Sequence, residues 1–313
     1  MATVAQWVAG ARLRTLPLAV APVLIGTGAA FGADQVGGFG SLIIGSLDPT
    51  VESEYRISGL LGKALLALLV SLFLQIGSNY ANDYSDGIRG TDDVRVGPLR
   101  LTASGTVPAV KVKQAAFLCF GIAAVAGVVL IIVASAWWFI PVGVAAVLAA
   151  WFYTGGKRPY GYMAMGELFV FVFFGLVATL GTTYALIGSL PIAAWSGAVG
   201  IGMLACAVLM VNNLRDIPTD SEVGKTTLAV LLGDQRSRHV YAALVFVPYM
   251  LLLVPILTGH ASAVLAALSL VLALSPLQTV LSGRTGADLI PCIKSTSITA
   301  LVYALLLALG MSL

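Results

Sequence analysis

Two clusters of Asn and Asp residues contain the side chains of this sequence best suited to chemistry. The first cluster spans residues 79–93 and reads NYANDYSDGIRGTDD. On a helix, Asn79, Asp83 and Asp86 are spaced i, i+4 and i+7, so they share one face. Two carboxylates one turn apart repel each other, and a hard divalent cation relieves that repulsion. The spacing therefore predicts a compact set of oxygen ligands for a metal ion.

The second cluster spans residues 212–222 and reads NNLRDIPTDSE. Asn212, Asp216 and Asp220 share one face if the helix continues past Pro218. Each cluster thus has an Asn four residues before an Asp at the end of an apolar run. A single carboxylate in such a place is commonly a solvated charge or a salt-bridge partner, whereas two matching clusters indicate a shared ligand.

Residues beside the two clusters add candidates for phosphate binding. Gly87 and Gly90 allow the chain to bend, which would bring Asp92 back toward the first cluster. Arg215 lies within the second cluster, and Lys225 follows it. Magnesium in proteins is usually held by a few carboxylates together with substrate phosphate oxygens, while Lys and Arg neutralise the remaining phosphate charge. The two clusters together predict a site for Mg²⁺, or Mn²⁺, and one diphosphate.

Residues 153–162 form a third polar segment, YTGGKRPYGY, with two cations and three tyrosines. Two interpretations stay open: the segment contributes its cations and tyrosines to the site, or it belongs to the aromatic belt and positive charge typical of a cytoplasmic membrane surface. The aromatic run at 169–174 has the same ambiguity, because aromatic faces stabilise cations and also pack against lipid and neighbouring helices.

The elements that must position these clusters are membrane helices. Of the 313 residues, 59% are hydrophobic and only 10% are charged, whereas soluble domains carry roughly 25% charged residues. A transmembrane helix needs about 20 mainly apolar residues. We therefore predict an all-α polytopic membrane bundle with one helix for each apolar run. The apolar runs are 16–32, 60–80, 115–134, 137–153, 168–187, 192–212, 240–258, 262–281 and 289–309.

Lys and Arg residues are unevenly divided between the loops that join these runs. With the N-terminus placed in the cytoplasm, all of the 17 Lys and Arg residues except Arg56 and Lys63 fall on the cytoplasmic side. Cytoplasmic loops carry the excess of positive charge in membrane proteins. We predict a multi-pass cell-membrane protein with its N-terminus and both acidic clusters in the cytoplasm. The odd number of runs places the C-terminus outside.

Other ligand chemistries and function classes are disfavoured. Cys119, Cys206 and Cys292 lie in apolar runs, and His239 and His260 are far apart, so we expect buried thiols and no Cys/His metal site. No large basic surface remains for nucleic acid once the spans are set aside. A transporter would need polar access from both sides of the membrane, whereas the two acidic clusters lie on one side.

The two clusters resemble the paired Asp-rich motifs of the UbiA-type intramembrane aromatic prenyltransferases. NDYSDG at 82–87, continuing to GTD at 90–92, resembles the first motif, and NNLRDIPTD at 212–220 resembles the second. The DYSDG form, ARLRTLP at 11–17 and GKTTLA at 224–229 are most similar to the branch that prenylates 1,4-dihydroxy-2-naphthoate in menaquinone biosynthesis. The resemblance covers essentially the whole chain.

The resemblance implies a fold and a reaction. The chain would form a single UbiA-type domain over 1–313, with nine transmembrane helices around a central cavity open to the cytoplasmic side and laterally to lipid. A polyprenyl group would pass from polyprenyl diphosphate to 1,4-dihydroxy-2-naphthoate with loss of CO₂ and diphosphate, giving demethylmenaquinone. Another acceptor on the same fold, 4-hydroxybenzoate or haem, stays an alternative.

The resemblance also implies roles for individual residues. The carboxylates that would bind the metal and the diphosphate are Asp83, Asp86, Asp216 and Asp220. The residues that would complete the diphosphate surround are Asn79, Asn82, Asp92, Arg215 and Lys225. The residues that would contact the aromatic acceptor are Arg158, Tyr153 and Tyr160. Besides the two substrates, the expected partner is membrane lipid.

Overall fold

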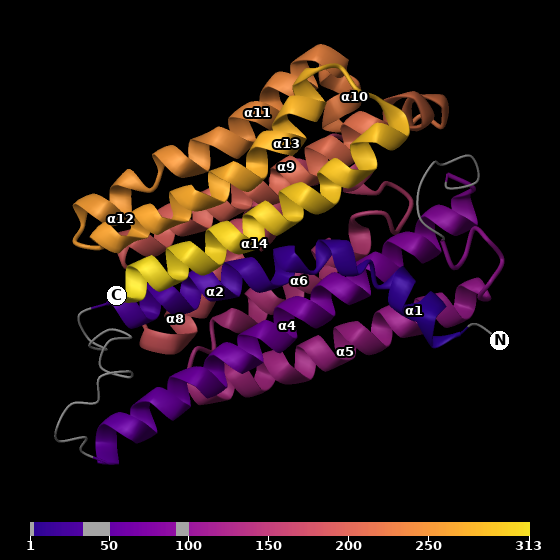
Figure 1. Ribbon diagram of the computed structural model, residues 1–313. Coiled ribbons are helices and arrows are strands. Elements are labelled where there is room, and N and C mark those ends of the chain that lie inside the picture. The colour runs from indigo at the N-terminus through magenta and orange to yellow at the C-terminus, as the bar shows by residue number, and fades with distance from the viewer. Residues whose placement is uncertain (1–2, 34–50, 92–99) are drawn as a thin grey trace.

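The protein is a bundle of helices that run side by side (Figure 1). The computed structural model describes residues 3–33, 51–91 and 100–313. Within these ranges every regular element is helical, apart from one isolated bridge between Met163 and Thr226. The N-terminal and C-terminal ends of the described chain lie at opposite ends of the bundle. The all-α prediction is confirmed.

The N-terminal half contains the helix that carries the first cluster. α1 (Val4–Gly10) begins at a capping box, and the chain bends by 50° between the η1 turn (Leu13–Thr15) and α2 (Pro17–Gly32). α4 (Val51–Arg89) packs along α5 (Ala109–Ala134). The short connection to α6 (Phe139–Phe152) turns through Ser135, whose φ is 53°, and forms a tight hairpin.

The second half begins with one continuous span made of α7 (Gly166–Val170), the π-helical η3 (Phe171–Val177) and α8 (Ala178–Ile187). α9 (Ile192–Glu222) carries the second cluster. The elements that follow are α10 (Leu228–Leu232), α11 (Asp234–Met250), α12 (Leu253–Leu257), η4 (Ala261–Ser269), α13 (Leu270–Leu281), η5 (Gly286–Leu289) and α14 (Ile290–Ser312).

α9 is the most enclosed span of the bundle. Of its most apolar stretch, 72% is buried inside the protein, against 17% for the span that contains α4. The main hydrophobic core forms where α9 meets α2, α11 and α14, and it includes Ile201, Leu204 and Met210. The second acidic cluster therefore lies at the C-terminal end of the span that other helices surround most completely.

The chain is a multi-pass integral membrane protein. In its described residues, seven helices are long and apolar enough to cross a membrane, and the bent pair formed by residues 4–15 and α2 makes an eighth. The remaining predicted run, 137–153, corresponds to the shorter apolar helix α6.

Gly28 allows a close approach of α2 and α14. A Cβ atom at Gly28 would lie 2.4 Å from the Cα atom and 2.5 Å from the carbonyl oxygen of Ala308. Small residues let membrane helices approach in this way. We expect Gly28→Ala to force the helices apart and to lower the free energy of unfolding by about 1–3 kcal/mol, measured by thermal unfolding in detergent.

Gly121 in α5 provides the matched control for Gly28, because no atom lies within 4 Å of the place its Cβ would occupy. Gly121→Ala should leave stability unchanged or raise it, since Ala favours helix by up to about 1 kcal/mol over Gly. Equal losses of stability in the two variants would contradict the packing argument.

Candidate active site

A cavity of about 350 Å³ lies between α2, α4, α5, α6, the η3–α8 span and α9. One end is polar, lies between the C-terminal parts of α4 and α9, and is lined by Asn82, Asp86 and Lys225. The other end is apolar and is lined by residues such as Leu130 and Val177. The cavity is therefore suited to a ligand with a charged head and a hydrocarbon tail.

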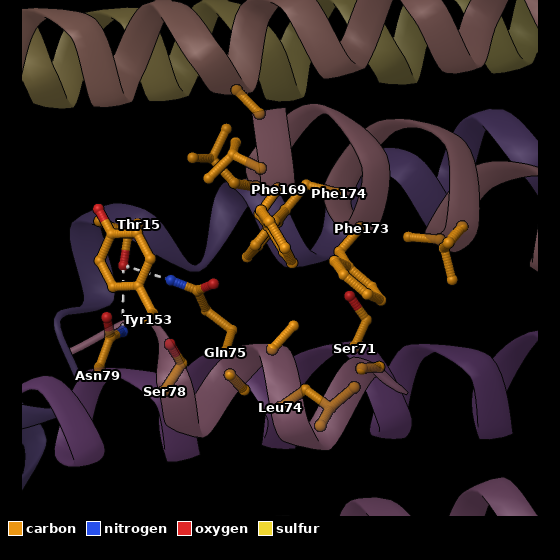
Figure 2. Close-up of a pocket in the computed structure, with 18 of the residues that line it drawn as sticks. Thr15, Ser71, Leu74, Gln75, Ser78, Asn79, Tyr153, Phe169, Phe173 and Phe174 are labelled. Carbon is orange, nitrogen blue, oxygen red and sulfur yellow. Dashed lines mark hydrogen bonds between the residues drawn. The ribbon is translucent and has the colours of Figure 1, made fainter. Parts of the chain in front are cut away.

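α4 continues without interruption through the first cluster to Arg89 and presents one polar face to the cavity. The polar residues of that face are Ser71, Gln75, Ser78, Asn79, Asn82 and Asp86. In Figure 2 the amides of Gln75 and Asn79 both reach Thr15, and their nitrogens lie 3.1 and 3.3 Å from its Oγ1. Asn79 Nδ2 also donates to the carbonyl oxygen of Ala11 at 2.9 Å. Asn79 therefore holds the turn that precedes α2.

Asn82 and Asp86 bind residues of the segment between α6 and α7. Thr154 Oγ1 donates to Asn82 Oδ1 at 2.9 Å. Tyr162 Oη, at the end of the η2 turn (Tyr160–Tyr162), donates to Asp86 Oδ1 at 2.8 Å. Burial, followed by the nearby Asp86 carboxylate, raises the pKa of Tyr162. The phenol therefore stays protonated and acts as the donor.

Asp83 lies on a different side of α4 from Asp86. Its side chain is 1% exposed, and its two oxygens accept the N–H groups of Leu101 and Thr102, each at 2.9 Å. Asp83 is not among the residues that line the cavity. This differs from its predicted place at the metal ion. Successive helical residues are rotated by roughly 100° about the axis, so Asn82 and Asp86 share the cavity face while Asp83 is turned away from it.

The second cluster lies on α9, which continues through Pro218 as the spacing of its polar residues requires. Arg215 donates from Nε and Nη2 to different oxygens of Asp216, both at 2.6 Å, and both side chains are buried. Lys225 Nζ lies 3.1 Å from Asp220 Oδ1. Asp216 and Asp220 thus each have a cationic partner.

Tyr162 and Lys225 join the two clusters. The loops that carry them are paired through the backbone, with the N–H of Thr226 donating to the carbonyl oxygen of Tyr162 at 3.1 Å. Lys225 Nζ lies 5.4 Å from the centroid of the Tyr162 ring, within cation–π distance. A continuous series of contacts therefore runs from Asp86 through Tyr162 and Lys225 to Asp220.

The geometry brings two Asn/Asp helix ends to the polar end of one membrane-embedded cavity. Residues 54–288 match the model of the UbiA prenyltransferase family. The chain belongs to that family. The resemblance inferred from the two motifs is thereby confirmed.

Individual relatives of this UbiA family member are similar over its whole length. It is 46% identical to the 1,4-dihydroxy-2-naphthoate octaprenyltransferase of Mycobacterium tuberculosis, over 98% of this chain and 97% of that one. It is 44% identical to the protein of the same name from Mycobacterium leprae, over 100% and 98% of the two chains. The solved structure of a UbiA homolog from Archaeoglobus fulgidus bound to GPP and Mg²⁺ covers 95% of this chain and 99% of its own, with a TM-score of 0.56 and 16% identity, which shows a shared fold.

The residues predicted to contact the aromatic acceptor fall into two groups in this UbiA chain. Tyr153 and Tyr160 line the cavity, and Tyr160 stacks on Phe169 with 4.0 Å between the ring centroids. Arg158 is exposed and is not among the lining residues. Asp92 lies outside the described residues. The two tyrosines are thus the better candidates for the acceptor site.

Some lining residues were not selected by the sequence analysis. Gln75 lines the cavity, as do Arg12 and Arg14 from the turn before α2. The sequence did contain a pattern that indicates Gln75. With Ser71 and Asn79 it forms a polar i, i+4, i+8 stripe in an apolar run, and polar residues inside membrane spans are commonly functional. The two arginines carried no such signal, since charge at the start of a span is explained by topology alone.

The polar end of the cavity suits a magnesium ion in the kind of ligand it offers. Asn82, Asp86 and Asn212 line it and provide oxygen ligands, which hard cations prefer. Asp216 and Asp220 do not line the cavity; they follow Asn212 on the next two turns of α9, where both are buried. In the described part of the chain no three acidic, His or Cys side chains meet at one point. Magnesium is usually bound through one or two carboxylates together with substrate phosphates. The donor set therefore fits an ion that binds together with the diphosphate.

Proposed function

We propose that this UbiA family member transfers a polyprenyl group from polyprenyl diphosphate to 1,4-dihydroxy-2-naphthoate, with loss of diphosphate and CO₂. The observation that carries the proposal is the junction of the two clusters through Tyr162 and Lys225 at the polar end of a cavity whose other end is apolar. The full-length relatives named for a naphthoate acceptor, at 46% and 44% identity, support the choice of acceptor.

The head of the prenyl donor would bind between the two clusters. Asn82 and Asp86 from α4, with Asp216 and Asp220 from α9, would hold Mg²⁺, or Mn²⁺, together with the diphosphate oxygens. A bound divalent ion stabilises the negative charge of a departing diphosphate. The bound diphosphate would replace Asp216 and Asp220 as the partner of Arg215 and Lys225.

Two cations are placed to receive the diphosphate. Lys225 lines the cavity, and its ammonium is within reach of the second cluster. Arg215 does not line the cavity, but its Nη1 is buried without a hydrogen-bond acceptor among the described residues. An unpaired buried donor is unfavourable by about 1–3 kcal/mol, so a phosphate oxygen that accepts from Arg215 Nη1 would stabilise the complex.

The reaction breaks the bond between the allylic carbon and the diphosphate oxygen, and the bonding electrons leave with diphosphate. A carbon of the naphthoate ring forms the new carbon–carbon bond, and the carboxylate leaves as CO₂ while its bonding electrons return to the ring. No electrons are lost, so the product forms as the quinol of demethylmenaquinone. Phe169, Phe173 and Phe174 line the cavity (Figure 2), and aromatic faces stabilise an allylic cation.

We infer nine membrane crossings in this single domain, with the bent α1–α2 pair and the short α6 each counted as one. The opposite positions of the two chain ends in Figure 1 support an odd number of crossings. The excess of Lys and Arg in the loops on one side supports a cytoplasmic N-terminus, a polar cavity end that faces the cytoplasm, and a C-terminus outside.

Membranes that contain the protein, incubated with labelled polyprenyl diphosphate and each candidate acceptor, test the proposed reaction. We expect Mg²⁺-dependent transfer to 1,4-dihydroxy-2-naphthoate with one CO₂ released per product, and no transfer to 4-hydroxybenzoate or haem. Chelation of the metal should stop transfer, and added Mg²⁺ or Mn²⁺ should restore it. Transfer to hydroxybenzoate but not naphthoate would assign a different acceptor, and transfer to none of the three would contradict the proposal.

A further inference from the structure

Both carboxylate oxygens of Asp83 bind the backbone of one turn. Oδ2 accepts the N–H of Leu101 and Oδ1 accepts the N–H of Thr102. The same turn is closed by its own backbone, with the N–H of Ser104 donating to the carbonyl oxygen of Arg100 at 3.1 Å. A carboxylate that accepts consecutive backbone N–H groups acts as a cap, as Asp does at a helix N-terminus. Asp83 therefore anchors residues 100–104 to α4.

The anchored turn fits closely between α4 and α1. Leu101 is fully buried, and a Cβ atom on Gly10 of α1 would lie 2.7 Å from its Cδ1. On α4, a Cβ atom on Gly87 would lie 2.6 Å from the Thr102 side chain. The bend predicted at Gly87 is therefore absent, because α4 continues to Arg89. The missing side chain of Gly87 instead leaves room for the turn at residues 100–104. The close fit means that the Asp83 hydrogen bonds select one position for this backbone.

Arg100 is the residue directly before the anchored pair, and it lines the same cavity as Asn82 and Asp86. A guanidinium binds phosphate through parallel hydrogen bonds that require an exact orientation, so a small displacement of its backbone weakens binding. The position of Arg100 depends on Leu101 and Thr102, whose N–H groups Asp83 binds.

We propose that Asp83 is a positioning residue that holds Arg100 at the diphosphate end of the cavity, and that Asp83 does not bind the metal ion. This inference rests on the proposed function, because it gives Arg100 a role in binding the diphosphate. It divides the first cluster into a face that binds the ligand, with Asn82 and Asp86, and a side that anchors the neighbouring turn, with Asp83.

Asp83→Asn tests the proposal, because an amide offers one oxygen and places an NH₂ group against the second backbone N–H. We expect KM for polyprenyl diphosphate to rise by roughly tenfold, as for loss of a hydrogen bond to a charged group. The Mg²⁺ concentration that gives half-maximal activity should change by less than about twofold. Arg100→Gln should raise KM similarly, and the double variant should be no worse than Arg100→Gln alone, because both changes act through one contact.

Asp86→Asn provides the comparison with a metal ligand, and it should raise the Mg²⁺ requirement by roughly tenfold or more. The control variants are Asp288→Asn and Arg284→Gln, which make the same kinds of substitution in an exposed ion pair with 3.7 Å between the charged atoms. Neither residue lines the cavity, so neither substitution should change KM for polyprenyl diphosphate or the Mg²⁺ requirement. If Asp83→Asn does not fold, Asp83→Glu, which keeps both acceptors one methylene farther out, is measured against the same criteria.

A raised Mg²⁺ requirement in the Asp83 variant, or additive effects of the Asp83 and Arg100 substitutions, would overturn the inference. Failure of the proposed function is a different result, because the unaltered protein would then transfer no prenyl group to naphthoate.

Discussion

Replacing Asp216 by Asn is expected to lower kcat/KM for prenyl transfer by about 10³-fold, equivalent to about 4 kcal/mol of transition-state stabilisation. Asp216 is buried on α9, one turn after Asn212 and one turn before Asp220. In the proposed reaction its carboxylate is a metal ligand at the place where charge develops on the diphosphate. The amide keeps the size of the side chain and removes its charge. Steady-state kinetics with both substrates over a range of Mg²⁺ concentrations measures the effect.

The effect of Asp216→Asn on folding must be separated from its effect on catalysis, because Asp216 pairs with the buried Arg215 at 2.6 Å. Removal of one partner from a buried ion pair typically destabilises a protein by about 3–5 kcal/mol. The double variant Arg215→Gln/Asp216→Asn removes both charges. It should recover much of the thermal stability lost in the single variant without recovering activity. Activity of a folded Asp216→Asn protein within tenfold of the unaltered enzyme would rule out this role for Asp216.

Filling the apolar end of the cavity at Gly181 is expected to block long prenyl groups and to spare short ones. Gly181 lines the cavity in α8, and no atom lies within 4 Å of the place its Cβ would occupy. A Phe ring there would occupy space that a hydrocarbon tail needs. Each methylene of the tail that can no longer be buried loses about 0.8 kcal/mol of binding free energy. We expect Gly181→Phe to lower kcat/KM for a C40 diphosphate by about 100-fold and for a C10 diphosphate by less than about threefold.

Parallel assays with the C10 and C40 diphosphates check the Gly181 prediction. Gly121→Phe places the same ring on an exposed position of α5 that does not line the cavity, and it should alter neither rate. Equal losses for the two chain lengths in Gly181→Phe would show that the substitution damages the enzyme in general, and that the apolar end of the cavity does not hold the tail.

The sequence by itself determined the membrane helices and the family of this protein. A bilayer leaves no water for the backbone, so apolar runs of sufficient length must form helices that satisfy their own hydrogen bonds. Eight of the nine predicted runs accordingly lie inside the long spans or the bent pair to within one residue, and the run at 137–153 contains α6. The three cysteines are buried and free, as their apolar surroundings predicted. The two motifs are local patterns, so they could be recognised without knowledge of the fold.

The tertiary structure alone decided which polar residues of the two motifs face the ligand. Helical spacing allows Asp83 or Asn82 to join Asp86, because each lies about one turn before it. The rotation of α4 is set by distant partners, namely Thr15, Thr154 and the backbone at 101–102, and it turns Asn82 inward and Asp83 away. Loop cations follow the same rule: Arg100 lines the cavity and Arg158 is exposed. These choices depend on contacts between segments far apart in the chain, which no local spacing encodes.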